Sequence, residues 1–199
     1  RVWYPDGDGP FPLVLVVHGN HLAEDFSDEG YDYLGELLAS RGMIVASVDE
    51  NFLNSTWDSI IGGLKEENDA RGWLLLEHLR QWRAWNSDPA SPFAGRVDME
   101  NIALIGHSRG GEAVAIAAAF NRLPAYPDDA AVAFDYGFNI RAVVGIAPVD
   151  GQYRPAGVGT PLRDVNYLVL HGSYDGDVQT LSAASQYDRV EFSEGFDGF

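Results

Sequence analysis

The segment from Gly106 to Gly111 has the pattern of a turn that carries a nucleophilic serine. It reads GHSRGG, with Ser108 flanked on both sides by a glycine two positions away. An apolar run, 102–105, comes directly before it, and an alanine-rich segment, 112–120, directly after it. A serine at the tip of a strand-to-helix turn has its hydroxyl lifted clear of the sheet. In a chain with 22 glycines this pattern alone is weak evidence for a catalytic serine. Its position between an expected strand and an expected helix, however, predicts Ser108 as the nucleophile.

The same turn offers a hydrogen-bond donor for a negatively charged oxygen. Arg109 begins the expected helix, where backbone N–H groups lack intrahelical partners and the positive end of the helix dipole lies. Its N–H could therefore hold the oxyanion of a tetrahedral intermediate. Gly106 and Gly110 lack the Cβ atoms that would collide where strand and helix come close. The alternative interpretation is a Gly-Ser turn without chemistry.

Alternating strands and helices are predicted around this turn. Apolar or β-rich runs predict strands at 11–17, 43–48, 101–105, 140–147 and 165–170, and helical spacing predicts helices at 31–40 and about 64–85. Near-continuous apolar strands that alternate with helices are typical of a parallel sheet covered on both faces. The predicted fold is therefore α/β, with a mostly parallel sheet and helices on both faces.

Length, composition and charge narrow the class of protein. A chain of 199 residues with 46% hydrophobic residues fits one globular domain, 1–199. The formal charge of −17 makes nucleic acid an unexpected partner, because an acidic surface repels phosphate backbones. No apolar run approaches the roughly 20 residues of a transmembrane segment. The absence of cysteine excludes disulfides, thiolate catalysis and Cys-type zinc sites.

Three segments together resemble the α/β-hydrolase superfamily: His18-Gly19 after the first long strand, the serine turn, and HGSYDGDV at 171–178. Within it, the chain looks most like the group of dienelactone hydrolases, cutinase-like polyester hydrolases and platelet-activating-factor acetylhydrolases. The resemblance covers about residues 14–190. It indicates a specific fold but does not identify one substrate. It implies an α/β-hydrolase fold and a serine esterase that acts on a small-molecule or polymeric ester and needs no cofactor or metal.

The loop after the first long strand supplies a second candidate donor. In the resembling family the residue after the His-Gly pair donates the other oxyanion N–H, which here is Asn20. Gly19 also lets the chain turn tightly at the carboxyl end of a strand, where open α/β sheets bind ligands. We interpret His18 as bracing this loop through hydrogen bonds rather than titrating in catalysis.

A catalytic histidine needs a carboxylate partner that fixes its tautomer. Asp175 lies just beyond the last predicted strand, and its spacing to Gly172 and Val178 fits the acid loop of the resembling family. Asp150 follows the preceding strand and is the second candidate, since some family members carry their acid there. Asp177 is the third, although an aspartate at that point would ordinarily cap a helix starting near Val178.

No histidine occupies the position that the family requires. The order in α/β-hydrolases is serine, acid, histidine, whereas all five histidines precede Asp175. Among them only His21, on a rim loop, is considered as a substitute base. We therefore expect a domain truncated at both ends, without the final strand and its histidine loop. The catalytic histidine then lies outside the chain, and a further segment completes the sheet edge. The alternative function is a noncatalytic hydrolase-like domain that binds a partner in the same cleft.

Overall fold

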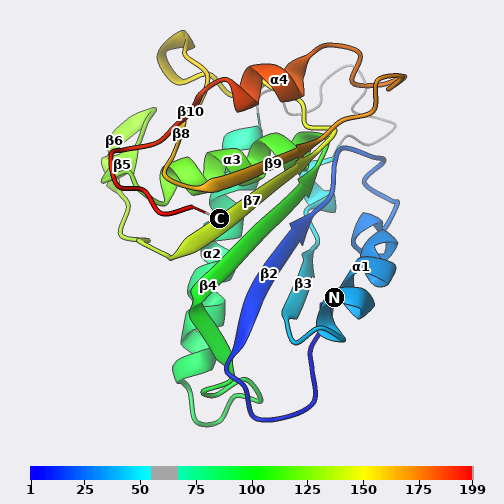
Figure 1. The fold of residues 1–199 in the computed structure, drawn as a ribbon, viewed down its shortest axis with the longest axis vertical. Helices are drawn as coiled ribbons and strands as arrows, with labels where there is room; N and C mark the ends of the chain where they lie inside the picture. The colour runs from blue at the N-terminus through cyan, green and yellow to red at the C-terminus, as the bar shows by residue number, and fades with distance from the viewer. Residues whose placement is uncertain (55–66, 199) are drawn as a thin grey trace.

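A computed structural model describes residues 1–54 and 67–198. Its centre is a six-stranded sheet in the order β1-β3-β2-β4-β7-β9 (Figure 1). β1 runs antiparallel to β3, and every other neighbouring pair is parallel. The strands of this sheet are β1 (Val2–Trp3), β2 (Phe11–Val17), β3 (Ile44–Val48), β4 (Val97–His107), β7 (Ile140–Ile146) and β9 (Asn166–Leu170). The predicted α/β fold with a mostly parallel sheet is confirmed.

Helices cover both faces of the sheet. α2 and α3 pack against each other behind the sheet, and α1 lies in front of it beside β3 (Figure 1). Leu15, Leu104 and Val143 of the central strands belong to one core with Leu75 and Ile116 of the two rear helices. The helices are α1 (Asp32–Ala39), α2 (Asn68–Ser87), α3 (Arg109–Phe120) and α4 (Ser182–Tyr187), with short 3₁₀ turns at Ser27–Tyr31, Asn51–Leu53 and Pro155–Gly157.

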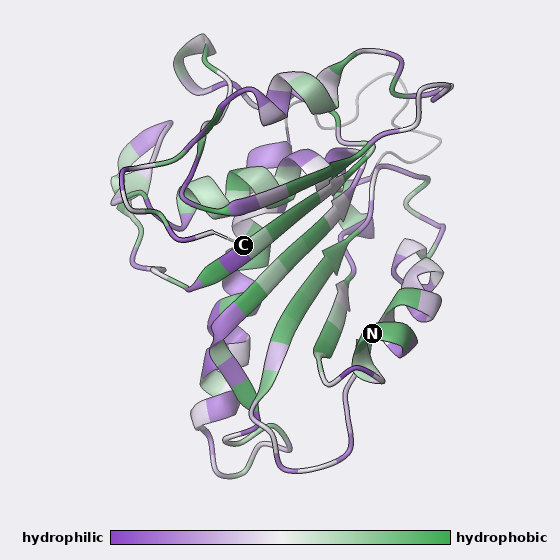
Figure 2. Ribbon diagram, in the orientation of Figure 1, coloured by the Kyte–Doolittle hydropathy of each residue, from purple (hydrophilic) through white to green (hydrophobic). Residues whose placement is uncertain are grey.

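The front face is less completely covered than the rear face. A small core of Val14, Val16 and Val45 lies under α1. Farther along the sheet, Leu168 and Leu170 of β9 are 53% and 51% exposed. Figure 2 shows the central strands as predominantly hydrophobic. Within the described part of the chain β9 pairs only with β7, so it forms an edge with exposed leucines.

The shortest elements escaped prediction, and some boundaries differ. β4 starts four residues before the predicted strand, because its pairing with β2 begins at Val97 and continues through a register shift. The hairpin of β5 (Ala125–Tyr126) and β6 (Asp129–Ala133) lies after α3, and β8 (Leu162–Arg163) pairs in parallel with β10 (Val190–Glu191). Strands of two residues carry no readable periodicity, and β6, although five residues long, reads DAAVA and shows no alternation of apolar and polar residues. None of the helices in the described ranges has the length and apolar character that crossing a membrane requires.

Candidate functional site

Ser108 occupies a strained turn between β4 and α3. Its φ of 55° and ψ of −120° fall where side chains other than glycine are rarely found. Hydrogen bonds hold this conformation: the Ser108 N–H donates to the Ile146 carbonyl at 3.0 Å, and its carbonyl accepts from Gly111 at 2.9 Å and Val149 at 3.1 Å. Strain of this kind persists only where the surroundings impose it, and it clusters at functional sites.

Three glycines make the close approach around Ser108 possible. A Cβ on Gly106 would lie 2.0 Å from the Gly110 carbonyl oxygen, and one on Gly110 would lie 2.6 Å from that of His18. A Cβ on Gly19 would lie 2.7 Å from the Ser108 Cβ. The chain therefore needs glycine at these positions for the β2 loop, the serine and the first turn of α3 to pack directly against one another.

The structure brings Asn20, Ser108 and Arg109 to one cavity of about 510 Å³. The segments 149–152 and 177–182 contribute its other lining residues. Arg109 is the first residue of α3, so its N–H is among those that find no partner within the helix. An ester whose carbonyl carbon is attacked by Ser108 would thus have Asn20 and Arg109, the residues expected to stabilise its carbonyl oxygen, in the same cavity.

His18 fixes the orientation of the peptide that carries the Asn20 N–H. Its fully buried ring accepts the Glu50 N–H at Nε2, 2.9 Å away, so Nδ1 carries the proton and donates to the Gly19 carbonyl at 2.7 Å. Burial lowers the pKa of His18, which favours this neutral form. The Gly19 carbonyl and the Asn20 N–H belong to one planar peptide group. The hydrogen bond that fixes the direction of the carbonyl therefore also fixes the direction of the N–H. This geometry matches the bracing role expected of His18.

Asp175 has the environment of an ionised carboxylate. Its Oδ1 accepts the N–H groups of Asp177 and Val178, each at 2.9 Å, and these bonds hold the pKa of Asp175 below its ordinary value. Its Oδ2 lies 3.7 Å from Nε2 of His171. Asp175 lines a neighbouring cavity of about 430 Å³ rather than that of Ser108, and the two cavities share the wall segment 178–180.

The other two acid candidates line the Ser108 cavity itself. The side chain of Asp150 is 7% exposed and forms a two-pronged ion pair with Arg189, in which one nitrogen lies 2.9 Å from Oδ2. The negative charge of the Asp150 carboxylate is therefore already paired with the guanidinium of Arg189, which stays positively charged. The expectation that Asp177 caps a helix starting near Val178 was wrong, because α4 begins only at Ser182. The Asp177 N–H instead supports Asp175.

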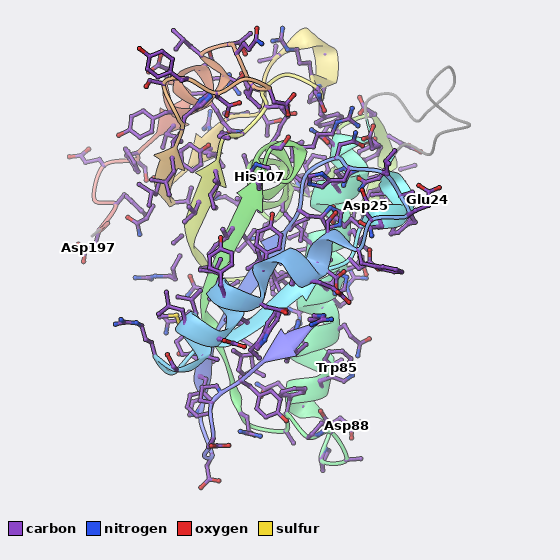
Figure 3. The ribbon with its side chains drawn as sticks, turned by 90° about the vertical axis from the view of Figure 1, so that its right-hand side faces the viewer. Glu24, Asp25, Trp85, Asp88, His107 and Asp197 are labelled. Carbon is purple, nitrogen blue, oxygen red and sulfur yellow. The ribbon has the colours of Figure 1, made fainter. Side chains whose placement is uncertain are left out.

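No histidine lines the Ser108 cavity or is hydrogen-bonded to the Ser108 hydroxyl in the described chain. His107 lies at the carboxyl end of β4 (Figure 3) and lines a different cavity of about 420 Å³, together with His18 and His21. The ring of His171 is directed at the Val178 carbonyl, 3.0 Å from its Nε2. Across 1–54 and 67–198, no three His, Cys, Asp or Glu side chains gather as a possible metal site.

Sequence reasoning missed Glu112, which anchors one wall of the cavity. This carboxylate is 3% exposed in the first turn of α3. Its Oε1 accepts the N–H groups of Gly151 at 2.6 Å and Gln152 at 2.9 Å, and its Oε2 accepts the side-chain amide of Asn68 at 2.6 Å. The available signal was a single carboxylate in an otherwise apolar helical segment, 110–120, where a surface role is unexpected.

A second group of polar side chains forms ion pairs and hydrogen bonds beside the serine turn. Glu50, Asn54, Glu67 and Arg71 are buried, and the side chain of Arg109 is 25% exposed. Arg71 lies 3.4 Å from Glu50 Oε2, 2.7 Å from Asn54 Oδ1 and 3.6 Å from Glu67 Oε1, and Glu67 also pairs with Arg109. Burial raises the pKa of Glu50 to about 8, although Arg71 opposes this rise.

Glu50 is expected to make the fold less stable as the pH rises. Since its pKa is higher in the folded than in the unfolded chain, its stabilising contribution is complete below about pH 4.5 and is lost as the pH rises through about 8. Between pH 5 and 9, the wild type should lose about 4 kcal/mol more unfolding free energy than Glu50→Gln. Urea unfolding of both proteins at pH 5, 7 and 9 measures this difference, and parallel curves would contradict the assignment.

Comparison with known families adds one finding. The sequence model of the family described as Chlorophyllase matches residues 1–161. The matched range includes Asn20, Ser108, Arg109 and Asp150, and it ends before Asp175. This family is an α/β-hydrolase-type esterase family, so the predicted superfamily is confirmed. A search among curated proteins found no match.

Proposed function

Since the chain belongs to the chlorophyllase family of α/β-hydrolase-type esterases, we propose that it cleaves carboxylic esters as a serine hydrolase, through an acyl-enzyme intermediate. The observation that carries the proposal is the cavity shared by Asn20, Ser108 and Arg109, with Ser108 on a strained turn. The substrate class is a small-molecule or polymeric ester, and the mechanism requires no metal or cofactor.

The proposed reaction has two halves. The Ser108 Oγ attacks the ester carbonyl carbon while a base takes its proton, and the carbonyl oxygen becomes an oxyanion held by the N–H groups of Asn20 and Arg109. Collapse of this intermediate expels the alcohol, which receives the proton from the base. Water, activated by the same base, then attacks the acyl-enzyme and releases the carboxylic acid and free Ser108.

Asp175 is proposed as the carboxylate that orients this base. Its hydrogen bonds from the backbone favour the ionised form, which an imidazolium partner needs. Asp150 is less suited, because Arg189 already neutralises it. The base itself is proposed to be a histidine outside these 199 residues. The rings of His18 and His171 are hydrogen-bonded elsewhere, and His107 and His21, the substitute considered above, line another cavity.

The edge of β9 that faces away from β7, over 167–170, is the proposed place for a further segment of chain. Leu168 and Leu170 present apolar surface on the sheet face beside this edge, and within the described residues β9 pairs only with β7, so this edge offers N–H and C=O groups to an added strand. Such a strand would run beside the segment that carries Asp175, because β9 leads directly into it. This proposal treats residues 1–199 as part of a single α/β-hydrolase domain that the added segment completes.

Labelling with a fluorophosphonate tests the nucleophile. The natural protein should be modified at Ser108, identified by peptide mass spectrometry, because the base and the oxyanion donors activate this hydroxyl. Ser108→Ala should abolish the labelling. Ser182→Ala is the matched control, since Ser182 lines the same cavity, and it should label normally. Labelling that persists in Ser108→Ala would sink the assignment, and a wild type that never labels would favour a noncatalytic binding domain.

A further inference from the structure

Two series of contacts lead from the proposed oxyanion donors, the backbone N–H groups of Asn20 and Arg109, into the protein interior. The first starts at the peptide that carries the Asn20 N–H. The carbonyl of this peptide is held by His18, whose ring accepts the backbone N–H of Glu50. The Glu50 carboxyl then lies 3.4 Å from NH1 of Arg71. His18, Glu50 and Arg71 are all fully buried, so water does not compete for these contacts.

The second series of contacts starts at Arg109, whose backbone N–H is the other proposed donor. Its guanidinium pairs with Glu67. The same Glu67 oxygen, Oε1, lies 3.6 Å from NH2 of Arg71. Arg71 NH2 also donates to Asn54 at 2.7 Å. Both series of contacts therefore end at the guanidinium of Arg71. Its NH1 contacts Glu50, on the side of the Asn20 peptide, and its NH2 contacts Glu67, which pairs with Arg109.

Stability alone does not account for this arrangement. Buried ion pairs contribute little net stability, and well-packed apolar side chains often replace them without loss. Here the pairing is also incomplete: within the described residues, Glu50 Oε1 and Arg71 Nε are buried without a hydrogen-bond partner. A buried polar atom without a partner costs free energy and calls for an explanation. The guanidinium does have one property that apolar packing lacks, a rigid fork that holds two partners at a fixed separation.

We propose that Arg71 is a positioning residue that sets the separation and direction of the two oxyanion donors. Oxyanion stabilisation depends on donors held about 2.7–3.1 Å from the charged oxygen, and a shift of about 1 Å costs on the order of 100-fold in rate. Arg71 lies on α2, which packs against α3, the helix that begins with Arg109. The inference rests on the proposed function, because it assigns Arg71 to the same reaction.

The test separates positioning from stability with a double variant that replaces both side chains of the Glu50–Arg71 contact. Arg71→Met with Glu50→Gln removes the link without leaving an unpaired carboxyl group at position 50, while Glu67 keeps Arg109. We expect this variant of the natural protein to melt near the wild-type temperature, with KM within about two-fold and kcat lowered by about 10- to 100-fold. Modification of Ser108 by the fluorophosphonate should slow by the same factor, because its phosphoryl oxygen occupies the oxyanion position.

Arg80→Met is the matched control, since Arg80 is an ion-paired arginine on the same helix that has no link to Arg109. It should leave kcat within about two-fold. If the double variant does not fold, Arg71→Lys replaces it, because lysine keeps the charge but offers a single nitrogen. The same loss of kcat is expected there. A folded variant with wild-type kcat would overturn the inference alone, whereas a wild type without Ser108-dependent labelling would overturn the proposed function and the inference with it.

Discussion

Ser108→Ala is expected to lower kcat for ester hydrolysis by about six orders of magnitude, as removal of a serine nucleophile does in the best-measured serine hydrolase. Alanine has no oxygen to form the acyl-enzyme, whereas the proposed oxyanion donors are backbone groups that the substitution leaves in place. Residual hydrolysis about 10³-fold above the rate in water should therefore remain. Turnover of p-nitrophenyl esters of several acyl lengths by the natural protein and by the variant measures the loss.

The comparison needs a control for the strained turn. Alanine at position 108 has to adopt the same φ of 55° as serine, so the fold should be preserved, and thermal unfolding checks this. Ser182→Ala, in the same cavity, should turn over esters at nearly the wild-type rate. A correctly folded Ser108→Ala variant that kept more than about one per cent of the activity would point to another nucleophile or to hydrolysis by water alone.

Asp175→Asn is expected to lower kcat by about 10⁴-fold, the loss measured for the equivalent change in a well-studied serine triad. Asparagine can keep Oδ1 as the acceptor for the Asp177 and Val178 N–H groups, so the loop should hold its shape. Its amide group then replaces Oδ2 and presents a donor where the base needs an acceptor. The base would adopt the wrong tautomer, and its cationic form would lose a negative partner.

Asp150→Asn is the contrasting variant. It removes a charge from the Ser108 cavity and weakens the pair with Arg189, yet the proposed reaction does not use this carboxylate. We expect its kcat to stay within about tenfold of the wild type. Steady-state kinetics of both variants with one ester decide between the candidates: a larger loss for Asp150→Asn than for Asp175→Asn would transfer the role of the acid to Asp150.

The features that could be predicted from the sequence are those that short-range patterns encode. The strand 11–17 was predicted with its observed bounds, because an unbroken apolar run and a His-Gly exit are local signals. The proximity of Asn20 and Ser108 followed from topology, since parallel strands end at one edge of a sheet. The steric demand for glycine at position 106 is also local, because a Cβ there would meet Gly110, whereas Gly19 and Gly110 meet Ser108 and His18 from distant parts of the chain.

The polar interior could not be predicted, because its partners lie far apart in the chain. Arg71 and Glu50 are separated by 21 residues, and Asp150 and Arg189 by 39. In a chain with 30 acidic and 13 basic residues, any of these charges could equally lie on the surface. Arg71 lies on α2, which packs against α3, and no periodicity reveals which distant carboxyl will face it.

The contacts of Glu112 have a mechanical consequence. One carboxylate at the start of α3 ties the loop at 151–153 to the helix that follows the serine, so these two pieces of backbone behave as a single stiff body. A bulkier ester would have to break these hydrogen bonds in order to bend that wall. Gln179 and Thr180 line another part of the same cavity, outside the segment that Glu112 holds. Under the proposed function, we therefore expect ester selectivity to respond more to substitutions at Gln179 and Thr180 than to substitutions at 151–153.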